Sequence, residues 1–448
     1  MQHFTTSILT IKELEQWLFR KMQDTFASIM KTVLEFWDEE ILKHRDRSRY
    51  RVKDERETSI YTVFGNIRYK RRLYYDRKTG KYVYLLDRLL KFEGGGKISP
   101  HLEETVIAFA SEGPSYRDSA ERLKQLLGYH VLSHEAIRGK LIEKSEKQQV
   151  KVAKRRPARV LFVEADGLYT KLQRSQKKGK ENAIAVVHEG WEKNGKRVSL
   201  RNKQYYLHEG GGDFWEGFGE FLTERYEIDE QTWLVVNGDG ANWIKECESY
   251  FHQCLFMLDR FHVARELKRF VGHLPKVWRE VRSALAKQDA TALMAAIEGV
   301  AEVEIAEEHR QEWRAYRSYL KQHKSHLEDY RKTLRAHGID TSGMRPMGSA
   351  EAQMRIFAKR TKRGGYSWSE RGVSAMLRTI MRRKEAQWLA VEMVEKEQEK
   401  PIRSFNMRSL TKQVTREVKG CVSGMIRLLQ GPQQSSPTGM ALKGLRGH

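Results

Sequence analysis

Cysteine is scarce in this sequence, with three residues among 448. Cys247 and Cys254 lie seven positions apart and Cys421 is remote from both, so the chain has no Cys-x-x-Cys pair for zinc binding or thiol redox chemistry. This scarcity excludes a disulfide-stabilised scaffold and fits a reducing compartment. We expect the thiols to be buried and chemically inert.

Long apolar runs are also missing. No stretch of about 20 apolar residues occurs, and the N-terminal residues lack the basic segment followed by an uninterrupted apolar segment that marks a secretory signal. These absences argue against membrane spanning and secretion. The sequence therefore predicts a cytoplasmic protein that has no membrane partner.

Acidic residues are too few to balance the basic ones. Lys and Arg total 82 against 59 Asp and Glu, which leaves a formal net charge of +23. Because 40% of the residues are hydrophobic and 10% aromatic, this charge belongs to a folded protein and not to a disordered basic tail. A basic folded chain of this size favours nucleic acid as its partner over an anionic membrane surface. Its length predicts two or three domains.

Residues 1–150 are predicted to form an N-terminal DNA-binding region. Apolar residues at helical spacing predict a helix or a helix pair over residues 11–45. Three β-like runs between residues 58 and 87, separated by Gly-Asn and Lys-Thr-Gly turns, predict β-hairpins.

Residues 115–148 predict two helices joined by a short turn that contains Gly128, with Ser133 as the N-cap of the second helix. This pattern is typical of a DNA-binding helix-turn-helix and equally of an ordinary αα-hairpin. Three basic residues on the second helix favour DNA: Arg138, Lys140 and Lys144.

A second domain is predicted over residues 158–385, after a basic linker. Alternating patterns predict three consecutive antiparallel strands, and a helix and two apolar strands follow. The predicted class is therefore mixed α/β, with a sheet that has helices on its faces. A helical module is expected at about residues 260–335, and residues 386–448 are expected to form a basic, partly disordered tail.

Two aspartates stand at predicted strand ends: Asp166 before Gly167, and Asp239 before Gly240. Either one alone could be an ordinary turn residue. Two such carboxylates at a common sheet edge would repel each other unless one is protonated or a cation lies between them. Hard oxygen ligands suit Mg²⁺ or Mn²⁺.

Glu351 is a third candidate acid, in the first turn of a helix that begins at Ser349. Its position could reflect the helix dipole alone. However, it is the sole acid between residues 345 and 363, where basic residues crowd: Arg345, Arg355, Lys359, Arg360, Lys362 and Arg363. An isolated carboxylate within a basic stripe suits a metal-dependent enzyme that acts on phosphodiesters.

Four strings, FVEADGLYTKLQ, VVNGDGANWIK, LDRFHVARELKR and SAEAQMRIFAKR, resemble the ISLre-type bacterial insertion-sequence transposases. The string FGNIRYKRRLYYDRKTGKYVYLLDRLL resembles the same family, so the resemblance covers most of residues 50–385. These are DDE transposases with an RNase H-like core. The resemblance implies such a core here, with an α-helical insertion before the third acid.

The resemblance further implies that Asp166, Asp239 and Glu351 are the catalytic acids and the ligands of Mg²⁺ or Mn²⁺. Asp259 and His262 are similar to an Asp/Cys-x-x-His signature of insertion-bearing DDE families and would be accessory residues.

Glu164 is a further accessory candidate. It lies two positions before Asp166, on the same face of the strand, and could replace or assist that aspartate as a ligand.

The implied activity is metal-dependent hydrolysis at the ends of a mobile element, followed by strand transfer into target DNA. Double-stranded DNA would be the partner, bound by the basic stripe around Glu351 and by the N-terminal region. A homo-oligomer on DNA and a nucleoid location in a bacterial cytoplasm are also implied. Two alternatives remain: an RNase H-like nuclease that cuts without joining, and a non-catalytic DNA-binding protein derived from a transposase.

Overall fold

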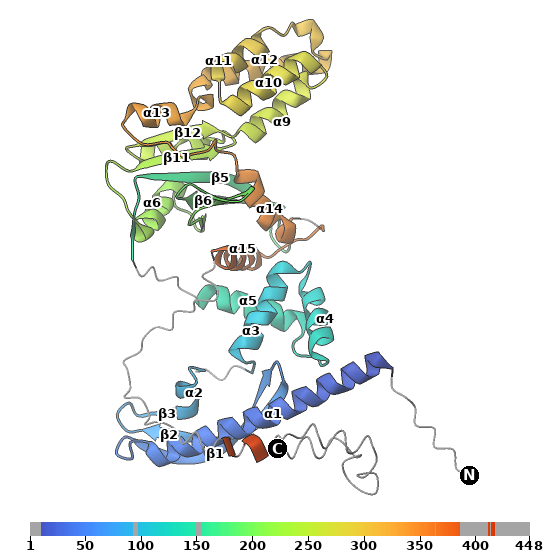
Figure 1. Ribbon diagram of the computed structural model, residues 1–448, viewed down its shortest axis with the longest axis vertical. Coiled ribbons are helices and arrows are strands. Elements are labelled where there is room, and N and C mark those ends of the chain that lie inside the picture. The colour runs from blue at the N-terminus through green and yellow to red at the C-terminus, as the bar shows by residue number, and fades with distance from the viewer. Residues whose placement is uncertain are drawn as a thin grey trace, which may run out of the picture. The chain divides into compact units, whose positions relative to one another are not determined.

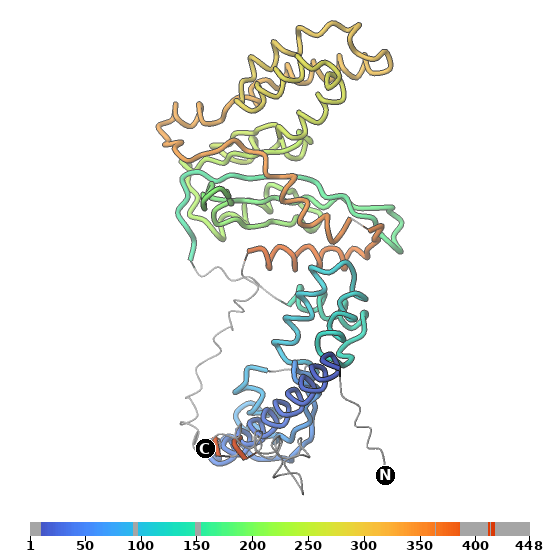
Figure 2. Tube along the Cα trace, turned by 45° about the vertical axis from the view of Figure 1, so that its right-hand side comes forward, coloured from blue at the N-terminus to red at the C-terminus, as the bar shows by residue number. Residues whose placement is uncertain are grey.

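The computed structural model describes residues 10–92, 97–147, 154–362, 364–385, 411–412 and 414–416 (Figures 1 and 2). The chain forms two compact units, divided between Arg138 and Gly139 inside helix α5 (His134–Lys147). The sequence placed this boundary later, at the basic linker. The predicted tail from residue 386 lies outside the described residues, except for short helical turns within 411–416.

The N-terminal unit begins with one long helix, α1 (Ile11–His44), as the first of the two sequence alternatives predicts. Thr10 starts it through a capping box: its hydroxyl accepts from the Glu13 amide, and the Glu13 carboxylate accepts from the Thr10 amide at 2.8 Å. α1 shares an apolar core with an antiparallel sheet and with α2 (Leu85–Leu89). The sheet strands are β1 (Tyr50–Thr62), β2 (Gly65–Asp76) and β3 (Lys81–Val83).

The predicted hairpins are confirmed, with two differences. β1 starts at Tyr50, earlier than predicted, because its charged residues lie on an exposed stretch of strand that needs no apolar alternation. The predicted third strand ends at Val83, and the residues after it form α2, whose Leu85 and Leu86 are buried in the core.

Three helices follow: α3 (Pro100–Glu112), α4 (Tyr116–Leu127) and α5. Gly128 ends α4 with φ of +76°, a left-handed conformation that glycine adopts readily. The Ser133 hydroxyl accepts from the Ala136 amide at 3.2 Å and so caps α5 as predicted. The two helices of the predicted pair are therefore present.

The second unit is built on a five-stranded mixed sheet with the order β12-β11-β5-β6-β9. β5 runs parallel to β11, and β11 runs parallel to β12, whereas β6 is antiparallel to both β5 and β9. The strands are β5 (Val160–Lys171), β6 (Gly179–His188), β9 (Gln204–Leu207), β11 (Trp233–Gly238) and β12 (Cys254–Leu258). The predicted mixed α/β class is confirmed.

Smaller strand pairs complete the β-structure of this unit. β7 (Trp191–Asn194) and β8 (Arg197–Leu200) form a hairpin between β6 and β9. β4 (Arg156–Pro157) pairs in parallel with β10 (Tyr226–Glu227).

Helices cover the two faces of the five-stranded sheet. Leu161, Val163 and Ala165 of β5 pack in one core together with α6 (Phe214–Arg225). Phe162, on the opposite face, packs in a second core with α13 (Tyr330–Ala336). This alternation along β5 decides which face each polar residue of the strand can reach.

The predicted helical module is confirmed between β12 and α14. Its main helices gather on the β12 side of the sheet (Figures 1 and 2). They are α9 (Arg260–Val271), α10 (Pro275–Lys287), α11 (Ala290–Glu298), α12 (Arg310–Gln322) and α13, with 3₁₀ turns at Glu302–Glu304, Glu307–His309 and Lys324–Leu327. The remaining helices are α7 (Asn242–Lys245), α8 (Cys247–Tyr250), α14 (Ala350–Thr361) and α15 (Glu370–Lys384).

The sequence predicts buried cysteine thiols and no membrane-spanning helix. Cys247 is buried and Cys254 partly buried, and both are free thiols, whereas Cys421 lies outside the described residues. None of the described helices combines the length and apolar character needed to cross a membrane.

His188, the last residue of β6, makes the stability of the folded protein depend on pH. Its ring is fully buried against Phe162, and its Nε2 has no hydrogen-bond partner among the residues that the structure describes. Burial lowers the pKa of His188 to about 4. Since the unfolded chain then binds a proton more readily than the folded one, stability falls as pH drops from about 6.5 towards 4. The wild type should lose unfolding free energy between pH 7 and pH 4.5. We expect this loss to be about 2 kcal/mol smaller in His188→Phe, as measured by urea denaturation.

His252→Phe is the matched control, because His252 is exposed in a loop of the same unit. An acid loss in His188→Phe equal to that of this control would contradict the assignment.

Candidate active site

Asp166, Asp239 and Asp259 lie side by side on β5, β11 and β12. Asp239 and Asp259 directly follow their strands, whereas Asp166, which the sequence placed at a strand end, lies inside β5, because β5 continues to Lys171 in its pairing with β6. Asn237 of β11 is paired with Glu164 of β5, so the same register places Asp239 opposite Asp166. Gly238 is paired with Leu258 of β12, and the Asp259 amide donates to the Gly238 carbonyl at 2.8 Å. The acids thus stand on adjacent parallel strands, whose neighbours lie about 4.8 Å apart.

Burial and neighbouring negative charges disfavour the ionised form of the Asp166 carboxyl group. Burial raises the pKa of Asp166 to about 6, and the nearby carboxylates of Asp239 and Asp259 raise it further, while the Gly167 amide and His262 oppose the rise. Three acids and one histidine therefore interact at this edge of the sheet. A bound cation would relieve the repulsion.

Asp166 and Asp239 each keep one carboxylate oxygen available. One oxygen of Asp166 accepts from the Gly167 amide at 2.8 Å, and one of Asp239 accepts from the Ala241 amide at 2.9 Å. The second oxygen of each has no hydrogen bond to the described chain. Two adjacent hard oxygens fit Mg²⁺ or Mn²⁺. Within residues 10–385 as described, however, no three His, Cys, Asp or Glu side chains are already grouped around a metal position.

Glu351 lies on α14, a helix that packs against β5, the strand of Asp166. α14 contacts β5, and Glu351 is in the first turn of α14. Its carboxylate forms an ion pair with Arg355 Nε at 3.1 Å. To join Asp166 and Asp239 at a metal, Glu351 would have to turn away from Arg355.

Ser349 precedes α14 as predicted, but its side chain does not cap the helix. Its hydroxyl instead donates to Glu164 at 2.8 Å. Glu164 is fully buried beneath the start of α14, and burial raises its pKa against the opposing effect of the Ser349 and Gly348 donors. The predicted accessory residue thus contacts the helix of the third acid.

The other accessory candidates lie at the start of α9. Asp259, fully buried, caps this helix by accepting from the Phe261 amide at 2.7 Å. His262, one turn later, interacts with Asp166 and lies 3.4 Å from an Arg265 nitrogen. Asp259, and not His262, is therefore the N-cap of α9.

The predicted DNA-binding residues fall into different environments. Lys359 and Lys362 are exposed on or beside α14. Arg360 is buried and packs over the rings of Tyr366 and Trp368, so it stabilises the fold and is not presented to solvent. Arg363 lies outside the described residues.

On α5 the predicted DNA contacts already have acidic neighbours. Arg138 pairs with Glu135 at 2.9 Å and Lys140 with Glu143 at 3.4 Å, on the same helix. Lys144 is half-buried. Trp243 packs beside Phe214 and Trp368 is buried, so both tryptophans belong to the core.

Sequence reasoning missed Tyr319 of α12. Its hydroxyl fills the space that a Cβ atom on Gly240 would occupy, directly after Asp239. Burial raises the pKa of Tyr319, and the Asp239 charge raises it further. The helical insertion therefore reaches the second acid. The Asp-Gly pair was visible in the sequence, but no local pattern links it to a residue 79 positions later.

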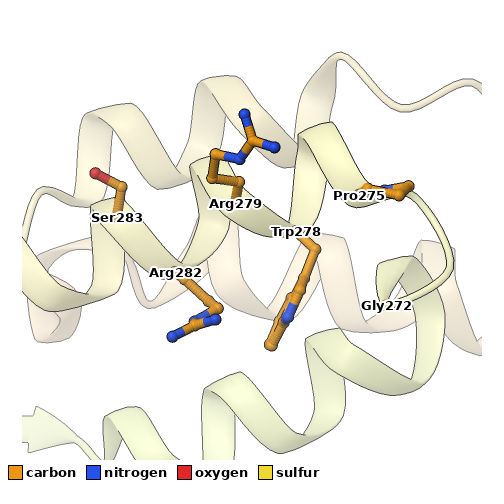
Figure 3. A pocket seen from close by; sticks show the side chains of 6 residues that line it. All are labelled: Gly272, Pro275, Trp278, Arg279, Arg282 and Ser283. Carbon is orange, nitrogen blue, oxygen red and sulfur yellow. The ribbon is translucent and has the colours of Figure 1, made fainter.

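A hollow of about 580 Å³ opens on the helical insertion, lined by the end of α9 and by residues of α10 (Figure 3). Trp278, Arg279 and Arg282 line it together with Gly272, Pro275 and Ser283. Arg279 and Arg282 are exposed, and neither forms an ion pair within the described residues. This is a positively charged surface beside an aromatic ring.

Comparison with known proteins identifies the family. The model of the uncharacterised protein family UPF0236 matches residues 4–397. The chain belongs to this family.

Two UPF0236 relatives illustrate the similarity. A UPF0236 protein in the vanSb 3′ region of Streptococcus gallolyticus is 26% identical over 380 residues, covering 82% of this chain and 81% of the relative. A UPF0236 protein of Caldanaerobacter subterraneus subsp. tengcongensis is 26% identical over 381 residues, covering 84% and 76%. The name of the second joins eleven locus designations of one strain.

Gly240 provides a test of the contact between α12 and the second acid. Gly240 has φ of +92° and faces the Tyr319 hydroxyl, whereas Gly210, with φ of +115°, has open space around it. We expect Gly210→Ala to cost about 1 kcal/mol of unfolding free energy from backbone strain alone. Gly240→Ala should cost about 1 kcal/mol more because Tyr319 must move.

Urea denaturation measures both variants. Adding Tyr319→Phe to Gly240→Ala should recover part of the extra loss, because it removes the atom that clashes. Equal losses for the two glycine variants would mean that Tyr319 does not occupy this position.

Proposed function

We propose that this chain is a DDE-type transposase of a bacterial insertion sequence, with an RNase H-like core interrupted by a helical insertion. The strand order β12-β11-β5-β6-β9, in which β6 is antiparallel to β5 and β9, supports this fold. The observation that carries the proposal is the register that places Asp239 opposite Asp166, next to the helix of Glu351.

The names of the relatives add support from genome organisation. One relative's name joins eleven loci of a single strain, and another's joins four loci of that strain. Repeated occurrence in one genome is what copying of a mobile element produces. Neither a housekeeping nuclease nor a single regulator needs many gene copies in one genome.

Asp166, Asp239 and Glu351 would hold divalent cations, which supply activation of the attacking oxygen and stabilisation of the leaving 3′-oxygen. In the sheet order Asp239 of β11 lies between Asp259 of β12 and Asp166 of β5, and α14, which carries Glu351, packs against β5. Asp166 and Asp239 would therefore hold the cations together, and Glu351 would join them from α14. If Glu351 turned to hold a cation, Arg355 would lose its partner and would be free to neutralise a phosphate.

The acids give the direct test of catalysis. We expect Asp166→Asn, Asp239→Asn and Glu351→Gln to lower Mg²⁺-dependent strand cleavage at least about 1000-fold, or roughly 4 kcal/mol of transition-state stabilisation. The substrates are labelled duplexes of the genomic DNA that flanks the coding sequence on each side. Gel analysis of cleaved and joined strands measures both steps.

Asp340→Asn is the matched control, because Asp340 is an exposed turn residue that bonds only its neighbour Ser342 in the described chain. Cleavage without joining would favour the nuclease alternative. DNA binding with no cleavage by the wild type would favour a non-catalytic protein, and full activity in Asp239→Asn would refute the site.

The hollow on α10 is proposed as a contact for DNA phosphates. We expect Arg279→Ala combined with Arg282→Ala to weaken duplex binding and to reduce the salt dependence of log K by about 2, one unit for each lost phosphate contact. Fluorescence anisotropy over a salt series measures both quantities. Arg314→Ala is the control, because Arg314 is exposed on α12 but paired with Glu302. An unchanged slope in the double variant would exclude this surface.

A further inference from the structure

Glu164 is the most fully bonded carboxylate of the site. One of its oxygens accepts from the Gly348 amide at 3.2 Å, from the Ser349 amide at 2.9 Å and from the Ser349 hydroxyl at 2.8 Å. The other accepts from Asn237 Nδ2 at 2.7 Å. Four donors therefore surround a side chain that is only 1% exposed.

Asn237 extends this network to the start of the helical insertion. Its Nδ2 also donates to Asp259 at 3.2 Å, and Asp259 caps α9. The network thus joins β5, β11, the first residue after β12 and the residues just before α14. Both ends of the helical insertion meet at Glu164.

Arg260 closes the same junction from the other side. Its guanidinium donates to the Met347 carbonyl from Nη2 at 2.8 Å and from Nε at 3.2 Å. Residues 259–260 open the insertion and residues 347–349 end it. The hydrogen bonds therefore fix the point where the chain returns from the insertion to the sheet.

We propose that Glu164 is a positioning residue that holds the start of α14, and with it Glu351, against the strands of Asp166 and Asp239, and that it is not a metal ligand. This inference rests on the proposed function. It assigns a role to the acid that the sequence alone could place only as a substitute for Asp166.

The contrast with Asp166 carries the argument. Asp166 has an oxygen with no partner in the described part of the chain, whereas both Glu164 oxygens have donors. Turning Glu164 towards a metal would take the acceptor away from the Ser349 amide and from one of the two N–H groups of the Asn237 side chain, which would keep only its bond to Asp259. Leaving such donors without an acceptor costs more than an average hydrogen bond contributes. Glu164 acts on the metal site through the helix it holds.

Amide hydrogen exchange tests the clamp without any catalytic assay. In Glu164→Gln, the side-chain amide group opposes the Asn237 amide group, and in Glu164→Ala the acceptor is absent. We expect deuterium uptake of peptides spanning residues 346–356 to rise about tenfold in rate in Glu164→Ala and less in Glu164→Gln. Peptides of β6 should not change. Uptake like that of the wild type in residues 346–356 would overturn the clamp.

Mn²⁺ binding, measured by calorimetric titration of the full chain, tests the positioning role. We expect Glu164→Ala and Glu351→Gln to weaken Mn²⁺ binding by similar factors, about tenfold. The double variant should be no weaker than Glu351→Gln alone, because Glu164 acts through Glu351. Losses that multiply in the double variant would identify Glu164 as a ligand, and no loss in Glu164→Ala would remove its role at the metal site.

Ser349→Ala keeps the test decisive if Glu164→Ala does not fold. It removes one donor only, so it should raise exchange and weaken Mn²⁺ binding in the same direction by a smaller factor, and Ser349→Thr should restore both. Absence of any Mn²⁺ binding by the wild type would refute the proposed function itself, an outcome distinct from losses that multiply.

Discussion

Carboxylates buried at the end of a sheet are stable only if each finds a proton, a donor or a cation, and this constraint organises the second unit. Glu164 and Asp259 are buried and hydrogen-bonded by protein donors, including the shared Asn237 amide. Asp166 is partly buried, next to like charges, with its pKa raised to about 6. Carboxylates whose oxygens all accept hydrogen bonds hold elements of the fold together. Carboxylates that keep an oxygen without a donor are available for chemistry.

The parallel strands explain why the acids meet. Because β5, β11 and β12 run in the same direction, their register carries on past the ends of β11 and β12 and places Asp239 and Asp259 beside Asp166 of β5. The helical insertion leaves from β12 and returns beside β5, where Glu164 binds the residues before α14. The insertion can therefore be large without displacing the third acid, since its two ends are tied at one junction.

The net charge of +23 does not say which basic side chains are available to bind a polyanion; their neighbours in the structure do. Arg138 and Lys140 are paired with acids on their own helix, and Arg360 is buried against aromatic rings. Arg279 and Arg282 on the insertion remain exposed without an ion pair in the described chain. Exposed, unpaired arginines release the most counterions on binding a polyanion, so location matters more than count.

The sequence by itself determined the elements and the candidate acids. Local periodicity and turn chemistry predicted α1, the hairpins and the strands of the sheet. The Asp-Gly pairs at Asp166 and Asp239 stood out together at predicted strand ends, although β5 continues past Asp166 to Lys171. The tertiary structure alone decided what Glu164 and Tyr319 contact. Those contacts join residues more than 70 positions apart, and long-range pairing depends on how the sheet and the insertion fold, which no local pattern records.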